Sequence, residues 1–207
     1  GKMESDYDFE PIKKALEGGR LDRETLLGSL SLRAVEDLEK LFARAGVSRD
    51  KTVVVYSDSR DILPGYHAVP FFTLEYLGHP DVRILVGGIE EWKAYGKPLD
   101  TNEHKLPPSV FKAQVVRQRV ATTDEVLRIA KGDLRDVQLV DSRLPVEFSG
   151  ERPAPPGHFL EKAVDKAGRI PNTTLNLPHF QQFVDMETLR LKKIPALAAM
   201  YQELDKN

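Results

Sequence analysis

The order of apolar and polar residues in the first half of the chain predicts helices that alternate with short strands. From Ser31 to Ala45 the apolar residues lie three and four positions apart, which predicts a helix that ends just before Gly46. Residues 68 to 77 predict a second helix, because a proline in the first turn is compatible with a helix. A weaker pattern over residues 7 to 27 predicts one or two short helices.

Two short apolar runs interrupt these helical patterns. Residues 52 to 56 and residues 82 to 86 are rich in β-branched residues, as strands buried on both faces are. Gly87 and Gly88 then turn the chain into a short helix over residues 89 to 95. This order of strand, helix, strand and helix predicts an α/β fold with a small, mainly parallel sheet flanked by helices.

A polar segment in the middle of the chain predicts a linker. Residues 97 to 108 hold three prolines and no periodic apolar face, so a domain boundary is expected near residue 106. Beyond it, Thr122 predicts the start of a helix. Residues 110 to 116 and 137 to 141 predict two strands. Residues 150 to 172 are rich in proline and glycine and predict a long loop, and residues 186 to 204 predict a helix that Pro195 splits.

Charge and hydropathy exclude two classes of partner. The chain has 30 basic and 32 acidic residues, and they are interleaved, so no broad positive surface for a phosphate backbone is expected. No apolar run approaches the roughly 18 residues that span a bilayer, and the acidic start is unlike a signal peptide. We therefore expect a soluble chain without a nucleic-acid partner, in the cytoplasm or the periplasm.

The chain contains no cysteine. This excludes disulfides, thiolate metal sites and thiol nucleophiles within it. None of the five histidines has a partner at metal-ligand spacing, so neither a metal nor another cofactor is expected.

Two regions resemble domains of the rhodanese (thiosulfate sulfurtransferase) family. Val-Val-Val-Tyr at 53 to 56, with the run from 74 to 92 that ends Val-Gly-Gly-Ile-Glu-Glu-Trp, is similar to the second half of such a domain. Leu-Val-Asp-Ser-Arg-Leu-Pro-Val-Glu-Phe at 139 to 148, with Gly-Arg-Ile-Pro-Asn at 168 to 172, is similar to an opening half. The resemblance implies a tandem rhodanese-like protein: residues 1 to 106 form a unit without its front strand, and residues 107 to 207 form the front part of a second, incomplete unit.

In this family a cysteine directly after the strand that reads Val-Val-Val-Tyr here carries sulfur as a persulfide. Backbone N–H groups that converge on such a loop lower the pKa of the thiol. The resemblance places a serine at that position, and serine forms no persulfide. The degenerate active-site loop would consist of Ser57, Asp58, Ser59, Arg60 and Asp61. We therefore expect no catalytic residue in this chain, and we expect the catalytic cysteine of a longer parent sulfurtransferase to lie outside it.

A second hypothesis treats the repeats as non-catalytic modules for interdomain packing, partner recognition or anion binding. The loop at 57 to 61 would then hold an anion, although a solvated turn is the simpler interpretation. The family's phosphatase-like branch is disfavoured because it also needs the cysteine. Whether the parent is an enzyme, and which sulfur donor and acceptor it uses, stays open at this point.

The remaining residues of the family motif have mainly structural roles in our interpretation. Asp141 and Arg143 are expected to hold loops through an ion pair. In the family's Gly-His-Ile-Pro-Gly turn an arginine replaces the histidine, and Asn172, which tolerates a left-handed backbone, replaces the last glycine. Trp92 is expected in the core. The other structural motif residues are Gly87, Gly88, Gly168, Arg169 and Pro171.

The division into partial units suggests how the chain associates. Exposed sheet edges invite pairing, so the half-domains are expected to complement each other, within one chain or between two copies. For the parent, the expected partners are small-molecule sulfur donors or acceptors.

Overall fold

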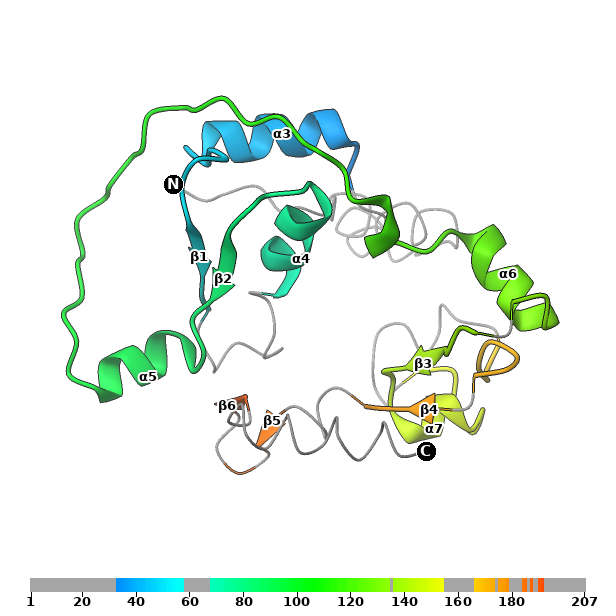
Figure 1. Ribbon diagram of the computed structural model, residues 1–207. Helices are drawn as coiled ribbons and strands as arrows, with labels where there is room; N and C mark the ends of the chain where they lie inside the picture. The colour runs from blue at the N-terminus through cyan, green and yellow to red at the C-terminus, as the bar shows by residue number, and fades with distance from the viewer. Residues whose placement is uncertain are drawn as a thin grey trace, which may run out of the picture. The chain divides into compact units, whose positions relative to one another are not determined.

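The computed structural model describes residues 33–57, 68–134, 136–154, 166–173 and 175–178, residue 187, and the backbone of residues 184, 185, 190 and 191 (Figure 1). The predicted helices at 7 to 27, the loop residues Asp58, Ser59, Arg60 and Asp61, and most of the C-terminal segment lie outside the described residues. The chain divides into two compact units. One comprises residues 1–56, 65–85 and 97–121, and the other comprises residues 57–64, 86–96 and 122–207.

The first unit contains the predicted alternation of helices and strands. Helix α3 spans Val35–Arg44 and is followed by Gly46 at φ 78°, the left-handed conformation that ends many helices. Strand β1 (Val53–Val55), helix α4 (Ala68–Tyr76) and strand β2 (Val82–Ile84) follow. The two strands pair in parallel, with Val53 opposite Val82, which confirms the prediction of a parallel sheet.

The core of the first unit lies between its helices. Leu38, Phe42, Leu74 and Leu77 are almost fully buried. The ring of Phe42 lies 5.8 Å from that of Phe111, centroid to centroid, at a tilt that aromatic pairs favour. A residue of the middle segment therefore completes this core.

Residues 110 to 116 form no strand, and this prediction was wrong. The amide of Gln114 donates to the carbonyl of Leu77 (2.8 Å), and the carboxylate of Glu39 accepts the amide of Ala113 (2.8 Å). In Figure 1 the segment runs alongside α3. Its backbone amides are hydrogen-bonded to a carbonyl just after α4 and to a carboxylate side chain, and not to a neighbouring strand. The domain boundary near residue 106 stays a prediction, although residues 97–121 group with the first unit.

The prediction that the strands are buried on both faces was also wrong for β1. Val54 is 51% exposed, and the neighbouring Tyr56 is 59% exposed. Among the described residues β1 pairs with one strand, β2, and its outward-facing Val54 lacks the cover that parallel sheets usually have. Local sequence reports how apolar a strand is, but not what covers it.

The second unit contains α5 (Gly88–Ala94), α6 (Thr123–Lys131), β3 (Val140–Asp141) and α7 (Pro145–Phe148). The helix starts after Thr122, as the sequence predicts, and a reciprocal capping box joins Thr122 and Glu125 there. Strand β4 (Leu175–Asn176) pairs with β3 in parallel. The short strands β5 (Val184–Asp185) and β6 (Arg190–Leu191) pair antiparallel, so the helix predicted from residue 186 is wrong at β6.

Two further predictions concern exposure and pairing. Trp92 is 38% exposed and no residue of α5 is buried, so its assignment to the core was wrong. The described strands form three two-stranded sheets, and the expected complementation of half-domains stays a prediction. None of the helices in the described part of the chain has the length and apolar character that a membrane span requires.

Candidate functional site

The chain directly after β1 is held by backbone contacts. The carbonyl of Ser57 accepts the amide of Ile89 at 3.1 Å, and Ser57 is partly buried. Gly87 and Gly88 have φ values of 79° and 57°, a conformation that residues with a Cβ rarely adopt. A Cβ on Gly88 would lie 2.3 Å from the carbonyl oxygen of Ser57. The Gly-Gly turn therefore brings two backbone segments closer than any other residue at position 88 permits.

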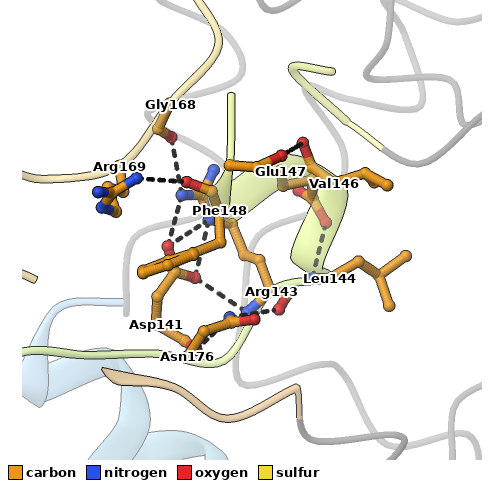
Figure 2. Close-up of polar contacts among 10 residues, drawn as sticks. Asp141, Arg143, Leu144, Val146, Glu147, Phe148, Gly168, Arg169 and Asn176 are labelled. Atoms are coloured by element: carbon orange, nitrogen blue, oxygen red, sulfur yellow. Dashed lines mark hydrogen bonds and ion pairs between the residues drawn. The ribbon is translucent and has the colours of Figure 1, made fainter. Parts of the chain in front are cut away.

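The chain directly after β3 is held by an ion pair (Figure 2). Oδ1 of Asp141 accepts the amide of Arg143 at 2.9 Å and its Nε at 3.0 Å. Oδ2 of Asp141 accepts Nη2 of Arg143 at 2.6 Å. The Asp141 side chain is 10% exposed and that of Arg143 is 40% exposed, so the pair lies at the edge of the protein interior. The predicted structural ion pair is present in this geometry.

The two charges stabilise each other's ionised forms. Hydrogen bonds from the Arg143 side chain hold the pKa of Asp141 below its usual value against the effect of burial, and the nearby charge of Arg169 acts in the same direction. The hydrogen bonds to Asp141 raise the pKa of Arg143. A pair that stays ionised in this way is suited to positioning and unsuited to proton transfer at neutral pH.

The ion pair is connected to two neighbouring segments. Nη2 of Arg143 donates to the carbonyl of Gly168 at 2.9 Å. The side-chain amide of Asn176, on β4, donates to the carbonyls of Asp141 and Arg143, each at 2.9 Å. The loop after β3 is therefore fixed to the adjacent strand and to the turn at residue 168.

Arg169 takes part in a second set of contacts. Its Nη1 donates to the carbonyl of Phe148 at 3.1 Å, and its guanidinium carbon lies 4.4 Å from the centre of the Phe148 ring. Such a cation–π contact is attractive because the ring face is negative. In the same helix, α7, the buried Glu147 accepts the amide of Leu144 at 3.1 Å. The arginine that replaces the family's histidine thus attaches its turn to α7.

The turn that follows contains Pro171, which is exposed, and Asn172 at φ 65°. This confirms that Asn172 adopts the left-handed conformation. Its side-chain amide donates to the carbonyl of Ala130 at 3.0 Å, at the end of α6. Asparagine therefore adds a contact that the family's glycine lacks.

An open groove of about 600 Å³ lies beside these residues. Three basic side chains, Arg143, Lys166 and Arg169, line it together with one carboxylate, that of Asp141, which is already paired with Arg143. Its chemistry favours a small anion over a cation. No cluster of possible metal ligands occurs among the residues that the structure describes.

Sequence reasoning missed the roles of three residues that support this site, namely Glu147, Phe148 and Asn176. All three lie within or beside the family motif. For Glu147 the sequence also offered a signal, because a glutamate three positions after a helix start is typical of a capping residue. Of the predicted degenerate loop the structure describes Ser57 alone, whose carbonyl accepts the amide of Ile89, whereas Asp141 and Arg143 are brought together as predicted.

Comparison with known proteins places the fold. Residues 4–95 match the family described as rhodanese-like domain. The chain contains a rhodanese-like domain. The chain is 34% identical over 171 residues to the sulfur carrier protein TtuD of Thermus thermophilus, an alignment that covers 82% of this chain and 58% of that protein. A putative thiosulfate sulfurtransferase of Saccharopolyspora erythraea is 31% identical over 69% of this chain and 48% of that protein.

Solved structures of this rhodanese-like fold agree with the architecture. Tum1 from Saccharomyces cerevisiae superposes with a TM-score of 0.64 over 83% of this chain and 56% of that chain, at 22% sequence identity. The rhodanese-like chain is therefore a relative of sulfurtransferases and sulfur carriers. It spans between about half and 60% of the length of the curated relatives named here.

Proposed function

We propose that this chain is part of a rhodanese-type sulfurtransferase that moves sulfur from thiosulfate to cyanide or a thiol acceptor, and that the chain is inactive alone. The observation that carries the proposal is Ser57, which lies two residues after the parallel strand β1 and is held against the Gly-Gly turn. The resemblance puts the family's cysteine at this position. With no cysteine in the chain, the nucleophile of the parent lies outside it.

The chemistry explains why a serine does not substitute. A cysteine thiolate attacks the outer sulfur of thiosulfate, the sulfur–sulfur bond breaks, and sulfite leaves with the bonding electron pair. The resulting persulfide gives its outer sulfur to cyanide, which yields thiocyanate and regenerates the thiolate. A serine hydroxyl remains protonated near neutral pH, so it is a poor nucleophile in this role.

The test compares the parent with this chain and with its Ser57→Cys variant. We expect thiocyanate production from thiosulfate and cyanide by the parent, and none by the unmodified chain. The control is Thr101→Cys, which puts a thiol on the exposed linker. Activity of Ser57→Cys without activity of Thr101→Cys would show that the first loop still supports the reaction. An inert parent would contradict the proposal.

A second candidate function is that of a non-catalytic, anion-binding module. The groove with Arg143, Lys166 and Arg169 favours it. Thiosulfate titrated into the chain by calorimetry would then bind, and Lys166→Gln would weaken binding more than Lys131→Gln, an exposed lysine on α6. Equal binding by both variants, or none by the unmodified chain, excludes the groove as an anion site.

We further propose that half-domains of two copies complement each other. Val54 on β1 and Val140 on β3 are each 51% exposed, and each lies in a two-stranded parallel sheet. Isolated two-stranded sheets are marginally stable, so an additional strand would stabilise both. Light scattering coupled to size-exclusion chromatography should show a dimer, and the Val54→Lys substitution should dissociate it. A monomer at all concentrations would exclude the proposal.

A further inference from the structure

The Gly87–Gly88 turn lies against the backbone of Ser57, the residue at the degenerate nucleophile position. The Cβ that a substitution would add at Gly88 meets the carbonyl oxygen of Ser57 at 2.3 Å and its carbonyl carbon at 3.5 Å. Both are backbone atoms, so neither can rotate away as the end of a flexible side chain does. At Gly87, by contrast, the added Cβ meets the side chain of Glu91.

A hydrogen bond acts on the same carbonyl. The amide of Ile89 donates to the oxygen of Ser57 at 3.1 Å. The carbonyl is therefore restrained from two sides, by a donor at residue 89 and by the close approach of residue 88. Neither restraint involves the side chain of residue 57, so both persist when that side chain changes.

We propose that Gly88 is a positioning residue for residue 57, and that the position remains preorganised for a thiolate although it carries a serine. The proposal deepens the function proposed above and rests on the assignment of Ser57 to the nucleophile position. Reactivity of a cysteine depends on its fixed place relative to surrounding N–H groups, because these stabilise the thiolate. A Cβ at position 88 that displaces the backbone of residue 57 would move a sulfur placed on that residue.

The absence of cysteine from the chain makes the test direct, since Ser57→Cys introduces its one thiol. The rate of alkylation by iodoacetamide, measured across pH, gives the pKa and the intrinsic reactivity of that thiol. We expect the thiol pKa of Ser57→Cys to lie below the usual value of about 8.5. Adding Gly88→Ala should raise it and lower the alkylation rate near neutral pH by about fivefold.

Gly96→Ala is the matched control. Gly96 has φ 64°, close to that of Gly88, but a Cβ there meets no atom within 4 Å. The backbone cost of alanine in the left-handed region is thus shared by both variants, and the contact with Ser57 is specific to Gly88. Equal thiol reactivity in the two double variants, or an ordinary thiol pKa in Ser57→Cys itself, would overturn the proposal.

A measurement on the unmodified chain keeps the proposal testable if Gly88→Ala fails to fold. The Ile89 amide should exchange its hydrogen about tenfold more slowly than an unprotected amide, because Ser57 accepts it. An unprotected Ile89 amide would contradict the proposal. Neither measurement depends on sulfur transfer. An inert parent would therefore contradict the proposed function without contradicting the positioning of residue 57 by Gly88.

Discussion

The chain fixes the residues after its two parallel strand pairs in different ways. After β1, the carbonyl of Ser57 is restrained by the amide of Ile89 and the bare Cα of Gly88. After β3, the carboxylate of Asp141 and the guanidinium of Arg143 hold each other through their side chains. The first arrangement tolerates a change of side chain at residue 57, whereas the second depends on both of its side chains. A position held by backbone alone can therefore lose its reactive group and keep its geometry.

The largest expected effect tests the backbone restraint. Gly88→Ala should lower the free energy of unfolding around α5 by about 3 kcal/mol, because it combines left-handed strain with a clash against a carbonyl. Gly96→Ala should cost about 1 kcal/mol, since only the strain applies there. Trp92 on α5 is the chain's single tryptophan, so its fluorescence during urea denaturation reports this region. Similar losses for both variants would contradict the contact with Ser57.

The side-chain restraint should respond to a change of one charge. Asp141→Asn replaces one acceptor oxygen by a donor that faces the guanidinium, and should lower the free energy of unfolding by about 2 kcal/mol. Asp136→Asn, on an exposed residue of the same unit, is the control and should change it by less than about 0.5 kcal/mol. Circular dichroism during urea denaturation measures both. A neutral Asp141→Asn would show that the loop is held by other contacts.

Acid should weaken the second arrangement. Arg143 holds the folded-state pKa of Asp141 below the unfolded value of about 3.9, so the stabilisation is complete above that value. It is lost as pH falls through the folded-state pKa. Because Arg143 is 40% exposed and solvent screens the pair, the loss should be about 1 kcal/mol.

The measurement is the difference in unfolding free energy between the unmodified chain and Asp141→Asn at several pH values. That difference should shrink as pH falls below the unfolded value of about 3.9 and through the lower folded-state pKa of Asp141. A difference that is constant over this range would mean that the charge of Asp141 contributes nothing.

The smallest effect concerns the arginine that replaces the family's histidine. Arg169→Lys keeps the positive charge but loses the flat guanidinium that stacks on Phe148. It should lower the free energy of unfolding by about 0.5 to 1 kcal/mol. Phe148→Leu should have little further effect in the Arg169→Lys background, and a double-mutant cycle measures this coupling. Additive losses would argue against a direct contact between the two side chains.

Patterns close together in sequence predicted structure well. The helix start at Thr122, the left-handed Asn172 and the Asp141–Arg143 pair depend on residues within a few positions, or on one residue's own backbone preference. The parallel sheet also followed from the order of strands and helices. In these cases local chemistry is sufficient to define the geometry.

The wrong predictions depend on partners far away along the chain. The segment at 110 to 116 has the alternation of a strand, but its backbone bonds to Leu77 and Glu39, some forty and seventy residues earlier. Trp92 is apolar at helical spacing, yet no described element buries its helix. The close approach of Gly88 to Ser57 was likewise invisible, because a Gly-Gly pair predicts a turn and not the backbone it touches.

One contact also determines how parts of the second unit open together. The side chain of Asn172 caps the carbonyl of Ala130 in the last turn of α6, although 42 positions separate the two residues. The carbonyl of Ala130, at the end of this helix, therefore gains its hydrogen bond from Asn172 only when the turn at residue 172 has formed. In kinetic terms, the last turn of α6 and the turn around Asn172 form one cooperative opening unit, whose amides should exchange with solvent at a common rate.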